Sequence, residues 1–186
     1  MRNTICSRAL CAIAALWIGQ PALSALADST YPQNEIRGGV SLHDMAGDET
    51  SGDLNAQFLG GFAAGQFTMP LAKAPTVVRP MVGGNLNLDG KTNDLYAGYA
   101  MTVDVTPKVF VEGSLGAMLH DGETSGHHED QADLGCRVLA RGSAGVGVRL
   151  NDRVNVSTDI ERATNLGACS PNDGLTNLNV RLGYSF

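Results

Sequence analysis

The sequence predicts an all-β fold, an eight-stranded antiparallel up-and-down transmembrane β-barrel. Three observations predict it: an N-terminal export signal, a series of segments in which apolar and polar residues alternate, and a final segment that ends on an aromatic residue. A chain that faces lipid without long apolar segments can alternate its side chains, one toward lipid and the next toward the lumen. Eight is the smallest even strand number of bacterial barrels, and closure leaves no open sheet edge in lipid.

The first 27 residues have the layout of a secretory signal peptide. Arg2 and Arg8 accompany an apolar run over 9–18, and a small-residue triplet ends at Ala27. The run is well short of the about 20 apolar residues that a transmembrane helix needs, although an uncleaved anchor remains the alternative. We therefore predict cleavage near Ala27 and a barrel domain over 28–186 that resides in the cell outer membrane.

The charge balance argues against a nucleic-acid partner. The predicted signal takes two of the 13 Lys and Arg residues and none of the 19 Asp and Glu residues, which leaves a net charge of about −8. Nucleic-acid binding depends on clustered basic side chains, and no such stripe remains. Cys136 and Cys169 are the cysteines left after the signal. Because the chain is exported to an oxidising compartment, we expect them to form a disulfide.

The C-terminal segment 176–186 is the clearest predicted strand. Its apolar residues fall on one face with a period of two, from Leu178 to Tyr184, and the segment ends on Phe186. The pattern resembles the last strand of outer-membrane barrels, with a soluble edge strand as the alternative. The other predicted strands run approximately over 34–44, 53–62, 77–88, 94–105, 108–120, 134–149 and 152–162.

The connections predict an orientation with both termini in the periplasm. Thr106-Pro107 and Asn151-Asp152 are expected to be tight periplasmic turns. The long link 63–76 falls on the same side and is expected to be an extended turn or a short amphipathic excursion. Longer polar connections are expected outside the cell, at 45–52, 121–133 and 163–174.

Several charged residues occupy the alternate strand positions that are predicted to face the lumen. An eight-stranded barrel is only wide enough for its interior to be filled by side chains, so we expect these charges to pair with one another. The predicted set is Glu35, Arg37, Asp104, Glu112, Arg149, Asp159 and Arg181.

The segment 162–176 resembles part of the outer-membrane lipid A 3-O-deacylase family, also called acyloxyacyl-hydrolase-like. In that family a His-x-Ser-Asn segment is followed by a Pro-Asn-x-Gly stretch and an acidic residue. Asn165, Asn172 and Gly174 match this spacing without a gap. Further similar segments are Glu35-Ile-Arg37-Gly, His43-Asp44, Arg79-Pro80, Gly83-Gly84-Asn85, Gly90-Lys-Thr92, Tyr96-Ala-Gly98 and Phe110-Val-Glu112-Gly, together with the two cysteines.

The resemblance implies a triad in which the histidine is the general base, the serine attacks the lipid A ester and the acidic residue orients the histidine. The three positions read Arg162, Thr164 and Thr176 here. Arginine stays protonated and cannot accept the proton of a nucleophile. Thr164 without a base is an ordinary alcohol, and Thr176 carries no charge to stabilise an imidazolium. We therefore expect the triad to be degraded.

No replacement chemistry is evident among the remaining residues. The histidines, His43, His120, His127 and His128, are expected at or beyond the extracellular strand ends. The adjacent pair His127-His128 is typical of a solvated loop, and we predict no metal site and no cofactor.

Three functions stay open at this point. The favoured hypothesis is a catalytically silent barrel that contacts outer-membrane lipid, with lipid A as the candidate, or is structural. Arg162 and Thr164 have the parity of the lipid-facing residues, and an arginine near the interface can reach a phosphate, although it can also simply extend to water. The alternatives are an active lipid A ester hydrolase with a rearranged site and an unrelated small structural barrel.

Overall fold

The computed structural model describes residues 34–47, 50–70, 73–125 and 132–186. All described residues belong to one compact unit. The predicted signal peptide therefore lies outside the described residues. No helix of the described part is long and apolar enough to cross a membrane. The described residues form nine strands: β1 (Glu35–His43), β2 (Ser51–Leu59), β3 (Gly65–Met69), β4 (Ala74–Asn87), β5 (Asp94–Asp104), β6 (Val109–His120), β7 (Val138–Arg149), β8 (Val154–Thr164) and β9 (Leu175–Ser185).

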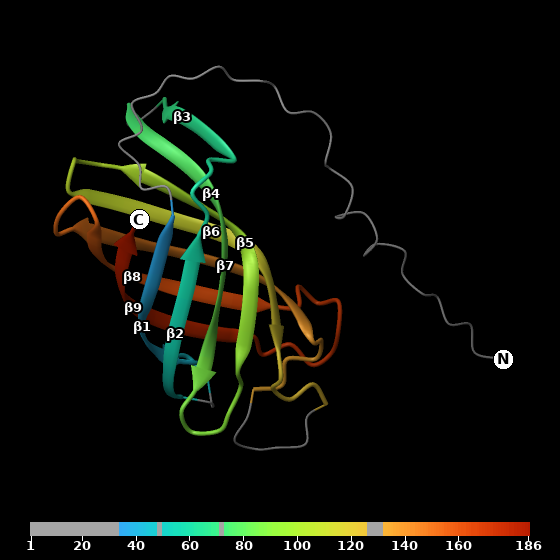
Figure 1. The fold of residues 1–186 in the computed structure, drawn as a ribbon. Helices are drawn as coiled ribbons and strands as arrows, with labels where there is room; N and C mark the ends of the chain where they lie inside the picture. The colour runs from blue at the N-terminus through green and yellow to red at the C-terminus, as the bar shows by residue number, and fades with distance from the viewer. Residues whose placement is uncertain (1–33, 48–49, 71–72, 126–131) are drawn as a thin grey trace. The chain divides into compact units, whose positions relative to one another are not determined.

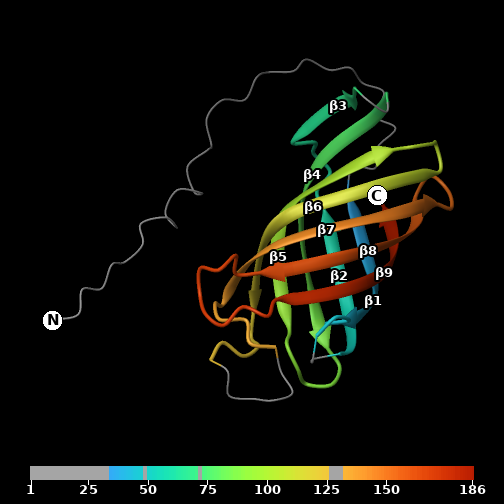
Figure 2. The same cartoon turned by 180° about the vertical axis from the view of Figure 1, so that it is seen from behind.

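Eight of these strands form a closed antiparallel barrel, as the sequence predicted (Figures 1 and 2). Neighbours in the sheet follow the order β2, β1, β9, β8, β7, β6, β5 and β4, and pairing of β2 with β4 closes the ring. The closing ladder runs from Asp53 opposite Asn87 to Leu59 opposite Met81. Closure gives every barrel strand a hydrogen-bonded neighbour on both sides, as lipid requires.

The remaining strand, β3, extends one wall of the barrel beyond the closing ladder. It pairs with the first part of β4, from Gly65 opposite Val78 to Met69 opposite Ala74. The sequence predicted an extended turn or amphipathic excursion over 63–76, and the structure shows a strand and hairpin there instead.

A bulge at Pro80 explains the break between β2 and β3. Gly60 N–H donates to Pro80 O (2.9 Å) and Ala64 N–H donates to Val78 O (2.7 Å), so residues 60–64 lie opposite only two residues of β4. The carbonyl of Pro80 points toward the β2 side, where its missing N–H would also have pointed. The ladder therefore opens at Pro80 and resumes at β3.

The predicted strands are confirmed in number and order for the barrel, with shifted ends. The sixth predicted segment, 134–149, becomes a strand only at Val138, and the predicted 152–162 continues to Thr164. Val105 and Thr106 N–H both donate to Val109 O (3.0 Å each), which confirms a tight turn at Thr106-Pro107.

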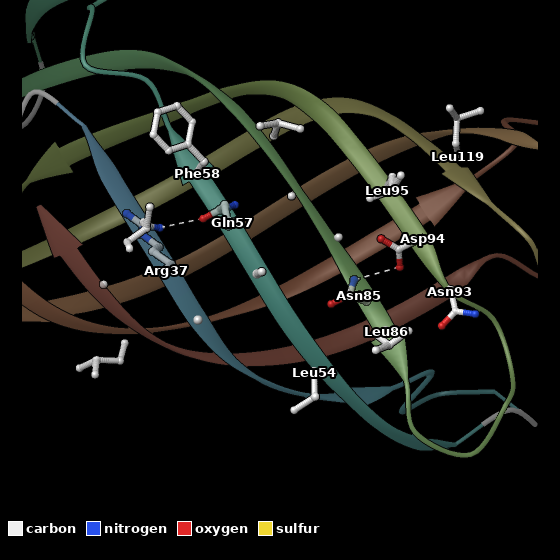
Figure 3. A pocket seen from close by; sticks show the side chains of 18 of the residues that line it. Arg37, Leu54, Gln57, Phe58, Asn85, Leu86, Asn93, Asp94, Leu95 and Leu119 are labelled. Carbon is white, nitrogen blue, oxygen red and sulfur yellow. Dashed lines mark hydrogen bonds between the residues drawn. The ribbon is translucent and has the colours of Figure 1, made fainter.

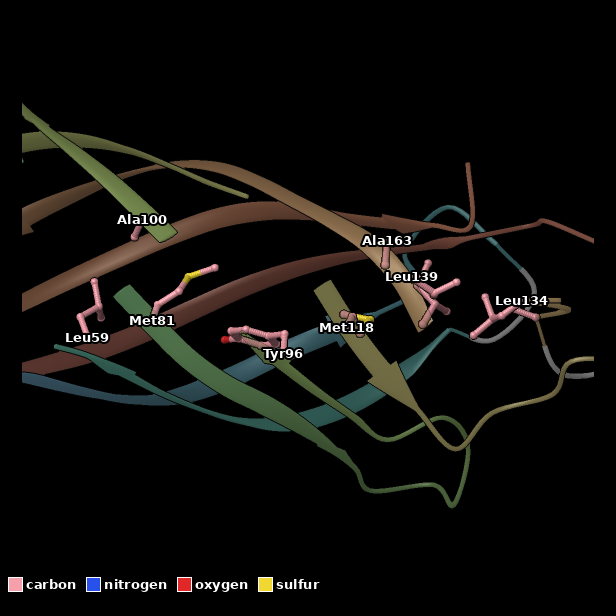
Figure 4. Packing of buried hydrophobic residues seen from close by; sticks show 10 residues of the cluster. Leu59, Met81, Tyr96, Ala100, Met118, Leu134, Leu139 and Ala163 are labelled. Atoms are coloured by element: carbon pink, nitrogen blue, oxygen red, sulfur yellow. The ribbon is translucent and has the colours of Figure 1, made fainter. Parts of the chain in front are cut away.

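The two faces of the wall differ as the alternation predicted. Large apolar side chains project outward and remain exposed, among them Ile36, Val40, Leu115, Ile160 and Leu182. Polar and charged side chains project inward and are buried. Toward the end with the longer connections, the interior also holds an apolar cluster that includes Tyr96, Met118, Leu134 and Leu139 (Figure 4).

All seven predicted lumen charges take part in ion pairs. Arg37 contacts Glu35 (Nε to Oε1, 2.7 Å) and Glu112 (Nη1 to Oε1, 2.6 Å). The other pairs are Arg149 with Asp104 and Arg181 with Asp159. The prediction omitted Arg79, which binds Glu35, and Arg141, which binds Glu161 and lies over the ring of Tyr96.

Arg37 joins the buried carboxylate of Glu35 to the largely buried carboxylate of Glu112, so its loss should cost more than the loss of an arginine on the surface. We expect Arg37→Met to lower the free energy of unfolding by about 3–5 kcal/mol, because Glu35 and Glu112 then lose their shared partner. The measurement is urea unfolding of the folded barrel. Val40→Met, on the same strand but facing outward, is the control and should have little effect. Equal stability of both variants would contradict this account of the interior.

Candidate functional site

The three positions predicted from the family triad lie together on the outer wall, at the barrel end that carries the longer connections. Arg162 on β8 is directly opposite Thr176 on β9 in the antiparallel ladder. Thr164 follows Arg162 by two residues and therefore faces the same side. Arg162 is exposed and the two threonines are partly exposed, whereas the alternating Glu161 and Ala163 are buried in the interior. The site is thus an outward patch, reached from outside the barrel.

Arg162 joins the two strands of this patch. Its Nη1 donates to Thr176 Oγ1 (2.5 Å), and its Nη2 donates to the backbone oxygen of Asp173 (2.7 Å). A guanidinium has five N–H donors, so these two bonds leave further donors on an exposed group. The position expected for the base thus carries a fixed positive charge, and the position expected for the acid carries a hydroxyl bonded to it.

Thr164 is bonded to an amide and not to a base. Its Oγ1 donates to Asn172 Oδ1 (3.0 Å) and accepts from the N–H of Leu166 (3.2 Å). Asn172 Oδ1 also accepts from the N–H of Asn165 (3.1 Å). A neutral amide oxygen is a poor proton acceptor, so this arrangement does not activate the Thr164 hydroxyl for attack.

Asn165 fixes the loop that follows β8. It is buried, and its Nδ2 donates to Leu134 O (2.9 Å) and Pro171 O (2.8 Å), while its Oδ1 accepts from Gly167 N–H (2.8 Å). These three side-chain contacts connect the loop to the neighbouring segment. The residue therefore shapes the patch and does not face a ligand.

The conformation of the loop before β9 requires a glycine at position 174. Its φ is +67°, in the left-handed region that favours glycine. A Cβ at this position would lie 2.6 Å from Ala163 O and 2.9 Å from Arg162 Nη2. Glycine therefore allows the loop to lie directly against the Arg162 guanidinium.

The predicted disulfide is confirmed and connects this loop to the start of β7. Cys136 and Cys169 are bonded, with their Cα atoms 5.7 Å apart. Asp133 and Asp173 add two further contacts: Asp133 N–H donates to Asp173 Oδ2 (3.0 Å), and Asp173 N–H donates to Asp133 O (3.1 Å). The loop that carries Asn172 and Gly174 is thus anchored at several points.

Asp44 also supports the patch, a role that sequence reasoning missed. Its Oδ1 accepts from the N–H of Thr176 (3.3 Å), and Met45 N–H donates to Thr176 O (2.8 Å). Asp44 itself is buried and has a φ of 39°. The His43-Asp44 pair had been noted only as a matching segment, and nothing in its spacing indicated contact with Thr176.

The histidines do not supply the missing base within the described residues. His43 Nδ1 pairs with Asp53 Oδ2 inside the barrel (2.8 Å), and His120 Nε2 lies 2.6 Å from Cys136 O. His127 and His128 lie outside the described residues. No group of three or more potential metal ligands occurs in the described part of the chain.

Comparison with known protein families identifies the family of this chain. A family model described as "Lipid A 3-O-deacylase (PagL)" matches residues 83–185, more than half of the chain. Comparison with curated protein sequences gave no match.

Solved structures agree on the fold. The crystal structure of the outer membrane enzyme PagL superposes with a TM-score of 0.63 at 12% identity, covering 82% of this chain and 99% of that one. A de novo designed transmembrane β-barrel gives 0.54 at 12% identity, covering 84% and 98%. The matched family segment runs from β4 to β9 and contains the whole patch, so the chain belongs to the PagL lipid A 3-O-deacylase family and is an outer-membrane β-barrel.

Proposed function

We propose that this barrel contacts lipid A at the outer-wall patch of its family without hydrolysing it. The observation that carries the proposal is the hydrogen bond from Arg162 to Thr176 (2.5 Å). It joins a permanently protonated group, where the resemblance implies the base, to the hydroxyl of Thr176, where the resemblance implies the acid.

The proposed loss of hydrolysis rests on the hydroxyl proton of Thr164, which has no suitable acceptor. Attack by Thr164 on an ester would require a group that removes the hydroxyl proton as the bond forms. Arg162 cannot accept that proton, and the acceptor bonded to Thr164 is the amide of Asn172. No histidine or carboxylate among the described residues is bonded to Thr164, so nothing favours the rearranged esterase.

The contact with lipid A rests on the chemistry of the exposed guanidinium. Arg162 lies on the outward face near the end of β8, where an arginine costs far less than at the bilayer midplane. Its remaining donors can form a bidentate pair with a phosphate. The matched family takes its name from lipid A, and by the predicted orientation this barrel end faces the outer leaflet.

Restoring the three reactive groups should restore hydrolysis. We expect the combined variant Arg162→His, Thr164→Ser and Thr176→Glu to release fatty acid from lipid A, because Gly174, Asn172 and the anchored loop are still in place. The unmodified chain should release none. Mass spectrometry of free fatty acid from the detergent-folded protein and lipid A measures this.

The matched control carries Arg162→His and Thr176→Glu with Thr164→Ala, which lacks the nucleophile and should be inactive. Fatty acid released by the unmodified chain would overturn the proposal. Failure of the restored variant, with its fold intact, would contradict the claim that only the reactive groups were lost.

Arg162→Gln tests the contact with lipid A separately from hydrolysis. Loss of the charge should weaken binding by about tenfold, since charge-assisted hydrogen bonds contribute roughly 1.5–3 kcal/mol. Binding is measured by titrating the detergent-folded barrel with phosphatidylcholine vesicles that contain lipid A. Arg137→Gln removes an exposed charge at the same barrel end and should have little effect. An equal loss in both variants would show that general rim charge, and not this patch, accounts for binding.

A further inference from the structure

Contacts that hold Arg162 and Thr164 come from the residues that directly follow the disulfide bond. Arg162 Nη2 donates to the backbone oxygen of Asp173 (2.7 Å), and Thr164 Oγ1 donates to Asn172 Oδ1 (3.0 Å). Asn172 and Asp173 are three and four residues after Cys169 in the chain. The placement of Cys169 therefore bears directly on where the Arg162 guanidinium is held.

The loop 165–174 lies against the segment 132–136, which precedes β7. A Cβ atom at Gly135, whose φ is +71°, would lie 2.1 Å from Pro171 O, so the two backbones are in direct contact. Leu134 anchors the segment 132–136, because its side chain is fully buried in the apolar cluster inside the barrel. The segment is thus a fixed support for the loop.

The covalent bond between Cys136 and Cys169 joins the loop to this support. Reciprocal hydrogen bonds between Asp133 and Asp173 add to it, at 3.0 and 3.1 Å. The net contribution of a hydrogen bond to stability is small, because water can replace either partner when the two separate. The disulfide is therefore the connection that prevents the loop from leaving its support.

We propose that the Cys136–Cys169 disulfide positions Arg162 for the contact with lipid A, and that reduction of the bond weakens this contact. The inference rests on the proposed function of the patch. With the bond intact, Asp173 O fixes one arm of the guanidinium, and further donors remain on the exposed group for a phosphate. With the bond reduced, the loop can separate from 132–136 and carry Asp173 away from Arg162.

Reduction requires a thiol from outside the protein, and both cysteines can be reached. Cys136 and Cys169 are partly exposed, at the barrel end that faces the cell exterior by the predicted orientation. A thiolate attacks one sulfur to form a mixed disulfide, and a second thiol releases it. The two electrons come from the thiols, which leave as a disulfide, and the protein keeps two cysteine thiols. The lipid A contact is thereby sensitive to external thiols.

Hydrogen exchange of the detergent-folded mature barrel tests the positioning role without lipid A. The amides of Gly167 and Asp173 are hydrogen-bonded within the loop and to the segment 132–136. They should exchange faster after reduction with dithiothreitol, because the loop then opens more often. Mass spectrometry of peptides that cover 165–174 measures this.

The control for hydrogen exchange is the ladder between β2 and β4, where Leu54 lies opposite Leu86 on the wall that Figure 3 shows. Neither strand pairs with β7 or β8, so exchange there should stay unchanged. Faster exchange in this ladder as well would mean that the disulfide stabilises the whole barrel, and unchanged exchange in the loop would mean that it positions nothing. Either result would overturn the proposal.

Lipid A binding tests the consequence for the patch. Reduction should weaken binding to phosphatidylcholine vesicles that contain lipid A by about fivefold, the factor expected if the released loop holds Arg162 in place about a fifth of the time. Reoxidation should restore binding. The Arg162→Gln barrel should show no effect of reduction, because it has no guanidinium to position. A loss of the same size in that variant would contradict the proposal.

A variant that cannot form the bond separates reduction from other effects of the reagent. Cys136→Ser with Cys169→Ser should match the reduced barrel in both measurements and should not respond to dithiothreitol. Both cysteines lie outside the strands, so the barrel should still fold, which the migration of unheated protein on a gel checks. If neither redox state binds lipid A, the proposed function fails, and hydrogen exchange alone decides whether the disulfide holds the loop.

Discussion

The need to pair every backbone hydrogen-bonding group in lipid governs this structure. It requires the sheet to close, and the ladder between β2 and β4 does so. Closure then divides each strand into lumen-facing and lipid-facing residues. The ion pairs around Arg37 fill the interior, and the outward positions carry the family patch. An insertion of one residue in β8 before Arg162 would exchange these faces and place Arg162 in the lumen.

The patch keeps its supporting structure although its reactive groups differ from the family pattern. Asn165, Gly174 and the disulfide hold the loop against β8, and Asp44 holds the backbone of Thr176. None of these contacts involves the side chains of Thr164 and Thr176. In the proposed function, the shape of the site persists while Arg162 puts a fixed positive charge where the resemblance implies a base.

Much of this arrangement follows from local sequence patterns. Alternation in the sequence predicted the barrel strands and the outward direction of Arg162 and Thr164, because side-chain direction in a strand depends only on parity. The exported location predicted the bond between Cys136 and Cys169. The predicted strand ends were less accurate. β7 begins at Val138 and β8 ends at Thr164 because of loop contacts, which the alternation of residues does not reveal.

Other features depend on contacts between distant segments. The β3 hairpin arises from the bulge at Pro80, whose effect on the opposite strand is absent from the pattern of 63–76. Arg141 and Glu161 pair across β7 and β8 near Tyr96, which requires the register to be known. Asp44 reaches Thr176 from a connection more than 130 residues away in the chain. The alternation of apolar and polar residues along the sequence does not predict these contacts.

The most direct measurement of the central claim is the mass spectrum of lipid A that remains bound to the barrel purified from an outer membrane. We expect bound lipid A that retains its 3-O-linked acyl chain, in an amount that depends on Arg162. Bound lipid A lacking that chain would contradict the loss of hydrolysis, and a barrel purified with no lipid A would contradict the contact.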